Sequence, residues 1–436
     1  MTSNGNGGVP LTFSVSERPE FMALFNDEVN ALSAIFKKHN FPIKLAGGPV
    51  RDILSGKVPS DLDFATTATP DQMKAIFDEE GVRMINANGE EHGTITARIN
   101  DRENYEITTL RIDKVTDGRR AEVEFTEDWR LDSNRRDLTV NSMFLDLEGT
   151  VTDYFRGSED LEKKRVAFVG SAVERIQEDY LRILRYFRFY GRIAEDPDAH
   201  EAATIEAIKE NVSGMKDISG ERIWMEWKKI LSGRFAGDIT LKMIEVGLGP
   251  HIGLPETPDT EEMKRIWQSC SEKNLHPVTL LVSLLRNDQE MAKLHSRLKL
   301  SGFERDLGYF VIAQRVDKLH PNPIRPYQFL IIDSKAKTTD VRQWTVEVLK
   351  YKGLDELAQE IEEWEIPKFP VNGYDLISEG CPKGRLMSVV TQELKTIWKE
   401  KDFAISREDL LKELPKILDN IDMSAYEQKK QRKPKK

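Results

Sequence analysis

The spacing of apolar residues predicts a mixed first third of the chain and a helical remainder. Between Phe21 and His39 apolar residues recur every three or four positions, which predicts one helix. The apolar run Ile43 to Ala46 predicts a strand, and alternating segments at 93–99 and 104–111 predict two more. From about residue 236 onward helical spacing continues without strand-like alternation. The pattern therefore indicates an α+β domain followed by helical ones.

Candidate chemistry lies directly after the first strand. The run breaks at Gly47-Gly48, and Val50 to Leu54 predict the start of a helix. Paired glycines let a ligand approach the backbone closely, and a helix N-terminus offers N–H groups to an anion. Asp61-Leu62-Asp63 follows. On a strand the two carboxylates would share one face, with Leu62 pointing into the core.

Two neighbouring carboxylates repel each other unless a cation lies between them. Oxygen ligands of this kind suit Mg²⁺, which typically joins one or two carboxylates to substrate phosphates. Taken singly, the glycine pair also fits an ordinary turn, and the Asp-x-Asp pattern also fits a solvated strand edge. Their combination on one strand–helix–strand unit favours nucleotidyl transfer, in which a metal activates a hydroxyl and steadies the leaving pyrophosphate.

Composition narrows the class of protein. The 436 residues allow roughly three domains of about 150 residues each. With 39% apolar and 32% charged residues, and apolar runs far below the roughly 20 residues of a membrane span, we expect a soluble globular protein. The two cysteines, Cys270 and Cys381, exclude a zinc finger and a disulfide framework. A net charge of −10 argues mildly against nucleic acid, but RNA is bound by local basic surface.

The motif Gly47-Gly48-x-Val50-Arg51-Asp52 followed by Asp61-x-Asp63 resembles the signature of the polymerase-β nucleotidyltransferase superfamily. More narrowly, it is similar to the class II tRNA nucleotidyltransferases, the CCA-adding enzymes, and to the related bacterial poly(A) polymerases. The resemblance implies an α+β fold with a small mixed-sheet palm or head, followed by all-helical neck, body and tail domains. The expected divisions are a disordered arm at residues 1–20, rich in Gly, Ser, Asn and Thr, and a head at 21–155. The neck is expected at 156–245, the body at 246–340, the tail at 341–428 and a basic disordered end at 429–436.

The resemblance also implies roles for residues of the head. Asp61 and Asp63 would be catalytic and would hold Mg²⁺. Glu106, on a predicted neighbouring strand, is the candidate for a third catalytic carboxylate, although an alternating strand exposes such a residue by default. Arg135-Arg136-Asp137 resembles a further family motif, in which Arg136 would pair with phosphate and Asp137 would accept from a ribose hydroxyl; an ordinary ion pair is the alternative. The implied nucleotide-binding residues of the head are Gly47, Gly48, Arg51, Asp52, Arg136 and Asp137.

The motif Glu178-Asp179-x-x-Arg182-x-x-Arg185, continued by Arg188, is predicted to lie on one helix. Asp179 and Arg182, three residues apart, would then be neighbours on its surface. The resemblance implies that these side chains, rather than a nucleic-acid template, select the base. Asp179 would accept a hydrogen bond from the amine of cytosine or adenine, and Arg182 would donate one to a ring acceptor. Arg185 and Arg188 would also belong to the nucleotide-binding site. A salt-bridged helix face is the alternative. Residues 113–134 are predicted to be a loop, which in the family helps to change nucleotide preference.

We therefore expect an enzyme that adds C, C and A to tRNA from CTP and ATP without a nucleic-acid template. It is expected inside the cell, in the cytoplasm, with the nucleus and the mitochondrion as additional sites. No membrane and no obligate protein partner are expected. The alternatives are a poly(A) polymerase or a CC- or A-adding enzyme of the same fold, or a catalytically silent RNA-binding relative. The run 429–436 holds six Lys or Arg in eight residues and is predicted to be disordered, as a tRNA-catching arm, an import signal or a solubilising end.

Overall fold

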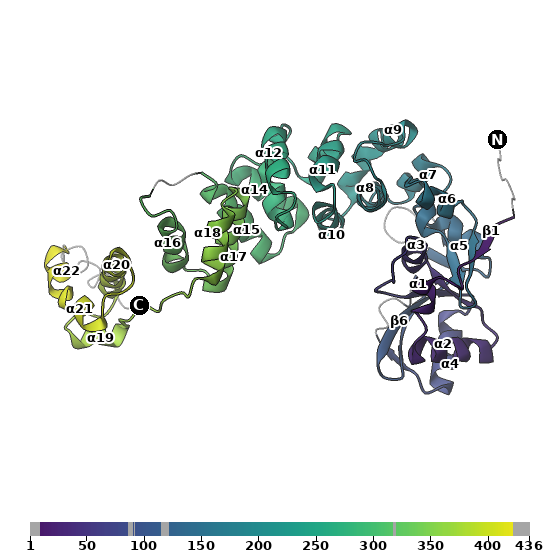
Figure 1. The fold of residues 1–436 in the computed structure, drawn as a ribbon, viewed down its shortest axis with the longest axis horizontal. Coiled ribbons are helices and arrows are strands. Elements are labelled where there is room, and N and C mark those ends of the chain that lie inside the picture. The colour runs from purple at the N-terminus through teal and green to yellow at the C-terminus, as the bar shows by residue number, and fades with distance from the viewer. Residues whose placement is uncertain (1–8, 86–89, 91, 115–121, 317–319, 422–436) are drawn as a thin grey trace, which may run out of the picture. The chain divides into compact units, whose positions relative to one another are not determined.

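The computed structural model describes residues 9–85, 90, 92–114, 122–316 and 320–421. Contacts between residues divide the chain into two compact units, Met1–Arg315 and Val316–Lys436, and each unit is described by itself. Figure 1 shows that the first unit begins with a mixed sheet and continues in helices. The expected α+β fold class is confirmed.

The head is built on an eight-stranded sheet with the order β1-β10-β9-β2-β3-β6-β5-β4. Among these described strands only β3 and β6 run parallel, and every other neighbouring pair is antiparallel. A separate hairpin pairs β7 with β8. The strands are β1 (Leu11–Ser14), β2 (Ile43–Ala46), β3 (Asp63–Thr66), β4 (Arg83–Ile85), β5 (Thr94–Ile99), β6 (Glu103–Thr109), β7 (Arg111–Lys114), β8 (Glu122–Phe125), β9 (Phe144–Asp146) and β10 (Thr150–Asp153).

Two helices pack their apolar sides into the main core of the head. Phe36 of α2 and Phe77 of α4 are fully buried there, with ring centroids 6.0 Å apart. α2 and α4 lie next to each other in Figure 1. Because this packing fixes β2, β3 and β6, the ends of these strands form a rigid edge for polar groups. The helices up to residue 162 are α1 (Pro19–Met22), α2 (Asp27–Lys38), α3 (Gly48–Leu54), α4 (Pro70–Glu79), α5 (Trp129–Arg135) and α6 (Gly157–Glu162), with the 3₁₀ turn η2 (Thr139–Asn141).

Three expectations for the head were wrong. The single helix at 21–39 is two helices, α1 and α2, because the Asn26 side chain accepts a hydrogen bond from Val29 N at 2.8 Å and starts a new helix there. Residues 11–14, expected within a disordered arm, form β1, which pairs with β10 far along the chain. The expected loop at 113–134 contains β8 and most of α5. Asp117 to Arg120, within that loop, lie outside the described residues.

The remainder of the first unit is helical, as expected. α8 contacts α10, and α10 contacts α11, α13 and α14, so α10 is the centre of this part. The helices are α7 (Ala172–Glu178), α8 (Arg182–Ile193), α9 (Ala202–Asn211), α10 (Gly220–Leu231), α11 (Ala236–Glu245), α12 (Thr260–Cys270), α13 (Pro277–Leu281), α14 (Asp288–Leu298) and α15 (Gly302–Gln314), with the 3₁₀ turns η3 (Val212–Asp217), η4 (Gly249–Ile252) and η5 (Val282–Leu284).

The second unit is also helical over its described residues and has its own core around Trp398. The expected boundary between body and tail at 340/341 falls inside α17, whereas the contacts separate the chain at 315/316. The basic run 429–436 lies outside the described residues. The helices are α16 (Arg325–Asp333), α17 (Thr338–Tyr351), α18 (Asp355–Glu363), α19 (Gly373–Ser378), α20 (Arg385–Glu400), α21 (Arg407–Lys412) and α22 (Leu414–Asn420).

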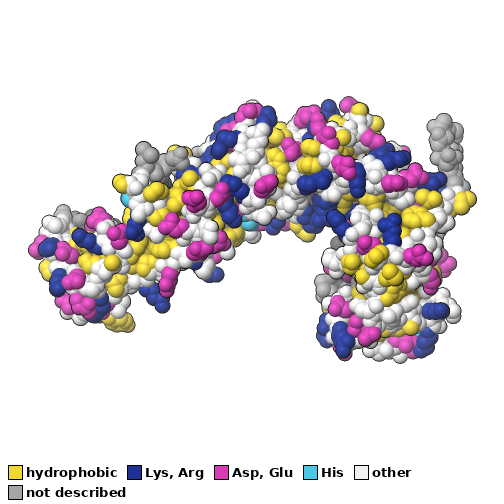
Figure 2. All heavy atoms as spheres, viewed as in Figure 1, with side chains coloured by type: hydrophobic (Ala, Val, Ile, Leu, Met, Phe, Trp, Pro, Cys, Tyr) yellow, Lys and Arg dark blue, Asp and Glu magenta, His cyan; other side chains and the backbone are white. Residues whose placement is uncertain are grey.

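Figure 2 shows Lys and Arg side chains interspersed with Asp and Glu over the visible face, so the negative net charge is not a uniform acidic surface. None of the described helices combines the length and the apolar composition that a membrane crossing requires.

Candidate active site

The parallel pair β3 and β6 brings two of the predicted carboxylates side by side. Asp63 begins β3 and stands opposite Glu106 of β6 in the register of the sheet. Asp61 lies two residues earlier, before the strand begins, so only one of the two aspartates belongs to β3. Leu62 between them packs against the head core, as expected. All three carboxylate side chains are exposed.

The electrostatics of Asp63 show that these acids influence one another. The pKa of Asp63 is raised, first by desolvation in the surrounding protein and then by the negative charges of Glu106 and Asp61, while Arg136 opposes the shift. A raised carboxyl pKa means that the ionised form is disfavoured where it stands. The edge of the sheet is therefore a place that would bind a cation favourably.

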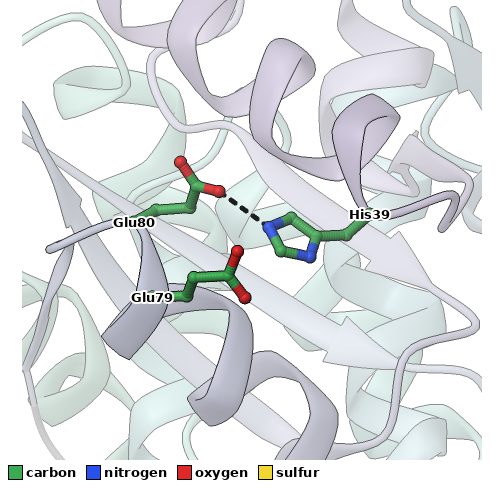
Figure 3. A group of neighbouring side chains, drawn as sticks. All are labelled: His39, Glu79 and Glu80. Carbon is green, nitrogen blue, oxygen red and sulfur yellow. Dashed lines mark hydrogen bonds and ion pairs between the residues drawn. The ribbon is translucent and has the colours of Figure 1, made fainter.

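A second group of possible metal ligands lies elsewhere in the head. Within the described residues, the ligand atoms of His39, Glu79 and Glu80 all lie within 4.8 Å of one another (Figure 3). The His39 ring and Glu80 share a hydrogen bond of 2.7 Å. The ammonium of Lys38 lies 2.6 Å from Glu80 and 3.9 Å from Glu79, so one positive charge already offsets part of the charge of the two carboxylates. It is a surface ion-pair cluster rather than a metal centre.

Arg136 is fixed beside the glycine turn by a buried acid. Its guanidinium donates to Asp132 Oδ2 at 3.0 Å and to the backbone oxygen of Asn141 at 3.3 Å. Burial alone would raise the pKa of Asp132, but Arg136 and Arg135 more than offset this, and the pKa lies below its ordinary value. Gly47 has a φ of +70°, and a Cβ there would lie 3.1 Å from Arg136 Nη1. The positive φ favours glycine at 47, and a Cβ there would in addition force Arg136 or the backbone of Asn141 to move by a few tenths of an ångström.

Arg51 of α3 is held in a similar way. Its guanidinium donates to Asp52 Oδ1 at 2.8 Å and to the side-chain oxygen of Asn141 at 2.8 Å. Asn141 thus contacts both Arg51 and Arg136. Gly48 has no positive φ, and a Cβ there would make only an ordinary contact with Arg51 at 3.9 Å. The two glycines therefore differ, because only at Gly47 does the backbone favour glycine.

Asp137 is buried and forms an ion pair with Arg185 of α8, in the helical part that follows the head. Arg185 Nε donates to Asp137 Oδ2 at 2.5 Å, across 48 residues of sequence. Burial raises the pKa of Asp137, yet Arg185 outweighs burial and holds it below the ordinary value. The other oxygen accepts from the backbone N–H of Leu138 at 2.9 Å. This pair links the head motif to α8.

The motif around Asp179 does not lie on one helix. α7 ends at Glu178, Asp179 has extended dihedrals of −155° and 105°, and α8 begins at Arg182. The Asp179 side chain accepts from Leu181 N at 3.1 Å, which favours the break. Tyr180 lies in the break against Gly214, where a Cβ would come within 2.1–2.3 Å of three of its ring carbons. The expected helix is thus two helices.

Asp179 and Arg182 each have another partner. Asp179 Oδ2 accepts from Arg222 Nη2 of α10 at 2.7 Å. Arg182 Nη1 donates to Glu178 Oε2 at 2.5 Å, and its Nη2 donates to the backbone oxygen of Arg135 at 3.0 Å. The two side chains come from adjoining segments, but they are not paired with each other.

Arg188 and Phe189 complete the arrangement on α8. Arg188 Nη1 donates to Glu226 Oε1 of α10 at 2.9 Å, and both side chains are only 9% exposed. Burial lowers the pKa of Arg188 to about 10; Glu226 opposes this shift, and Arg185 and Arg192 add to it. The Phe189 ring has four guanidinium groups within the reach of cation–π attraction, those of Arg188, Arg51, Arg185 and Arg192 at 4.4, 5.0, 5.7 and 5.9 Å.

Several residues that organise the site were missed from the sequence as functional residues. Asp132 stands four residues before Arg136, a helical spacing that could have indicated the pair. Asn141 follows the motif of Arg136 and Asp137 but carried no assigned role. Arg222 and Glu226 belong to the segment Ser219-x-Glu221-Arg222-Ile223-x-x-Glu226, which resembles a family motif that supports the neck, but its pattern does not reveal their partners. For Phe189 the sequence holds no local signal.

Comparison with known proteins finds similarity in both the head and the helical part that follows it. The family model of the poly A polymerase head domain matches residues 43–167, and that of the probable RNA and SrmB-binding site of polymerase A matches residues 201–259. The fold is similar to the crystal structure of the Bacillus stearothermophilus CCA-adding enzyme in complex with CTP, with a TM-score of 0.74 and 24% identity over 92% of this chain and 98% of that chain.

Two curated relatives are similar over almost their whole length. CCA tRNA nucleotidyltransferase 1, mitochondrial, of Danio rerio is 51% identical over 399 residues, which cover 91% of this chain and 92% of the relative. The Homo sapiens protein of the same name is 48% identical over 404 residues, with 92% of each covered. These similarities show that the chain belongs to the CCA tRNA nucleotidyltransferase family.

Proposed function

We propose that this chain adds C, C and A to the 3′ end of tRNA from CTP and ATP, with Asp61, Asp63 and Glu106 at the centre of the reaction. The observation that carries the proposal is the juxtaposition of Asp63 with Glu106 across the parallel pair β3 and β6, with Asp61 two residues away and the pKa of Asp63 raised. Three exposed acids that have no basic partner within hydrogen-bond distance among the described residues fit a reaction in which cationic charge is supplied with the substrate.

The nucleotidyltransferases of this family use a divalent metal, and we propose that here it is Mg²⁺, held by Asp61 and Asp63. The donor set fits, since carboxylate oxygens are hard ligands and a Mg²⁺ ion typically shares them with substrate phosphates. When bound, the metal supplies Lewis-acid activation of the attacking hydroxyl and neutralises the leaving pyrophosphate. Glu106 stands beside Asp63 and would orient it or complete the ligand set.

The residues around the glycine turn would hold the nucleotide. Arg51 and Arg136 are already oriented by Asp52, Asp132 and Asn141, and Arg fits phosphate groups bidentately. Gly47 and Gly48 keep side chains away from the backbone where the triphosphate would approach. The ribose contact proposed for Asp137 requires its buried carboxylate to become accessible, because its two oxygens already accept from Arg185, Leu138 and Asn141.

Base selection is proposed for Asp179 and Arg182, with Arg185 and Arg188 supporting them. Cytosine and adenine both place an amine next to a ring acceptor, which matches an Asp beside an Arg; guanine and uracil place a carbonyl where the amine should be. In this structure Asp179 is held by Arg222 and Arg182 by Glu178, and each side chain has hydrogen-bonding capacity left, so it could contact a base by adding a partner or by reorienting. The break between α7 and α8 gives Asp179 a backbone that is not locked in a helix.

The direct test offers each labelled nucleotide separately to a tRNA that lacks its 3′ end. We expect two C residues and then one A, with activity lost in a chelator and restored by Mg²⁺. Long runs of A would indicate a poly(A) polymerase, arrest after CC or activity only on tRNA-CC would indicate a partial enzyme, and no turnover would indicate a silent relative. The similarity to proteins named for complete CCA addition favours the full reaction.

We also propose a location inside the cell. Cytoplasm and nucleus are predictions from the sequence alone, and the mitochondrial names of the relatives favour the mitochondrion as one site of action. Microscopy of the tagged full chain, together with cell fractionation, tests this directly. Absence from mitochondria would restrict the protein to tRNAs outside them.

A further inference from the structure

A basic cavity lies on the helical side of the site, between α8, the end of α10 and the start of α11. Its volume is about 260 Å³, and it is lined by Arg188, Arg192, Lys228, Lys229, Ser232 and Gly233 among others. Figure 2 shows Lys and Arg side chains gathered around α10 on the visible face. A cavity of this size has room for several waters or for a phosphate group with its hydration.

The charges that line the cavity do not cancel. Lys228 forms an ion pair with Glu304 at 2.6 Å. The pKa of Glu304 is lowered to about 2, because its interactions with Lys228 and Ser301 outweigh the effect of burial. Arg188 and Lys229 share a single acid, Glu226, at 2.9 and 3.7 Å. Four cations thus face two carboxylates, which leaves a net charge of +2 at the cavity.

Arg192 is the most available of these cations. Its guanidinium lies over the Phe189 ring at 5.9 Å, and within the described residues it makes no ion pair or side-chain hydrogen bond. The side chain is exposed. The positive charge of Arg192 is therefore free to meet a ligand from solvent.

A role in folding alone accounts for some of the basic residues around the cavity, but not for all of them. Lys228 and Lys229 stand in the last turn of α10, where the carbonyl end of a helix favours cations in any protein. Arg188 is different, because its side chain is nine-tenths buried and lines the cavity, and its Nε–H has no hydrogen-bond partner. A buried donor that lacks a partner costs free energy unless a ligand satisfies it.

We propose that this cavity binds one phosphate group, held by Arg188, Arg192 and Lys229. The proposal rests on the assigned family reaction, which offers two sources of phosphate, the tRNA backbone and the triphosphate of the incoming nucleotide. Both present the same chemistry to an arginine or a lysine.

The geometry favours the tRNA backbone. Arg185, Arg188 and Arg192 recur at helical spacing along one side of α8, and seven residues of helix separate Arg185 from Arg192 by about 10 Å. Arg185 contacts Asp137 of the head motif, and the cavity is lined by Arg188 and Arg192, about one and two turns farther along α8. Arg51 of the head lies over the same Phe189 ring as both of them, so the cavity adjoins the head. A triphosphate bound by Arg51 and Arg136 in the head would not also bind in the cavity. The tRNA strand, in contrast, continues away from the 3′ end that reacts, and one of its phosphates could bind there.

The test measures tRNA affinity and nucleotide kinetics in the same full-length variants. Arg192→Gln with Lys229→Gln removes two charges without touching the head. We expect tRNA binding at moderate salt to weaken on the order of 3- to 10-fold, and the slope of log affinity against log salt to fall by about 0.7 for one lost phosphate contact. The KM values for CTP and ATP, and kcat at saturating tRNA, should stay unchanged.

Charge-retaining and distant variants serve as controls. Arg192→Lys with Lys229→Arg should bind tRNA nearly as the natural chain does, and Lys209→Gln, an exposed lysine on α9 outside the cavity, should leave the affinity unchanged. A rise in KM for both nucleotides with unchanged tRNA affinity would mean that the cavity binds the triphosphate of the nucleotide and not the tRNA backbone. Unchanged affinity, salt slope and KM in a folded double variant would overturn the proposal. Addition of C, C and A by the same samples shows separately that the assigned reaction stands.

Discussion

Two charged regions of the first unit, the acidic edge of β3 and β6 and the arginines of α8, differ in whether their charges are paired. At the edge of β3 and β6, Asp61, Asp63 and Glu106 gather like charges, are exposed, and have no basic partner within hydrogen-bond distance among the described residues. On α8, the guanidinium groups of Arg185 and Arg188 are each paired with a buried acid. The first region is incomplete without a cation, and the second is largely complete by itself.

This difference implies separate roles: the acidic edge binds a ligand, whereas the ion pairs of α8 hold side chains in position. Repulsion at the acidic edge is a cost that a bound metal removes, so these residues should matter to activity and little to folding. A buried ion pair behaves in the opposite way, since loss of one partner leaves an uncompensated charge in the interior. The residues of α8 should therefore affect stability first, with effects on substrate choice following from altered geometry.

The largest expected effect is on catalysis at the acidic edge. Asp61→Ala or Asp63→Ala should reduce addition of both C and A by about 10³-fold or more, because the charge stabilisation of a catalytic metal is worth several kcal/mol and each 1.4 kcal/mol is tenfold. Turnover with labelled CTP and ATP measures this, and tRNA affinity should persist. Asp71→Ala, an exposed acid on α4, is the matched control and should be active. Substantial activity of either variant in Mg²⁺ would remove that residue from the metal site.

The next effect is on stability, at the paired region. Glu226→Ala leaves the Arg188 guanidinium buried without its acid, and we expect a loss of about 3–5 kcal/mol in the free energy of unfolding. Glu226→Gln keeps an acceptor and should lose less. Denaturant unfolding of both variants gives the values. A loss below about 1 kcal/mol for the alanine variant would mean that Arg188 finds other compensation, and the contrast between the two regions would fail.

A smaller effect is expected on nucleotide choice. Asp179→Ala or Arg182→Ala should lower discrimination against UTP and GTP by about 1–3 kcal/mol, by analogy with base reading in DNA grooves. Competition assays with all four nucleotides measure the ratios of kcat/KM. Glu174→Ala, an exposed acid of α7, is the matched control and should discriminate normally. If all four nucleotides lose activity in proportion, Asp179 and Arg182 are structural.

The smallest effect is on the stability of metal-free protein. The pKa of Asp63 is raised in the folded state, so its ionisation destabilises the fold as pH rises through that pKa, and the penalty is absent below the pKa of the unfolded chain. Asp63→Asn should therefore raise the melting temperature slightly in chelator at neutral pH, and should give no gain at acid pH. Added Mg²⁺ should stabilise the natural chain more than the variant; equal stabilisation of both would contradict the proposed ligand role.

The chain itself predicts some features well, for local reasons. The strand Ile43–Ala46 was predicted with the bounds that the structure has, because an apolar run ended by glycine leaves little choice. The expected helix at Val50–Leu54 begins slightly earlier, at Gly48. The roles of Asp61, Asp63, Glu106 and the nucleotide-binding residues stay predictions until the variants are measured.

Other features depend on contacts that no local pattern records. Apolar spacing runs without interruption from Ile176 through Leu181 to Phe187, so it cannot reveal the break at Asp179, which depends on a side-chain hydrogen bond and on packing against η3. β1 depends on pairing with β10, about 140 residues later. The partners of the α8 arginines are likewise set by the tertiary fold.

The packing of Tyr180 against Gly214 has a consequence for how this protein can evolve. Even one methyl group at position 214 would meet the Tyr180 ring, and Tyr180 adjoins Asp179, whose side chain is proposed to recognise the base. The two positions therefore cannot drift independently. Across lineages, a residue larger than glycine at 214 should be found together with a smaller residue at 180, and an ancestor that acquired the first change alone would have passed through a stage of altered nucleotide fidelity.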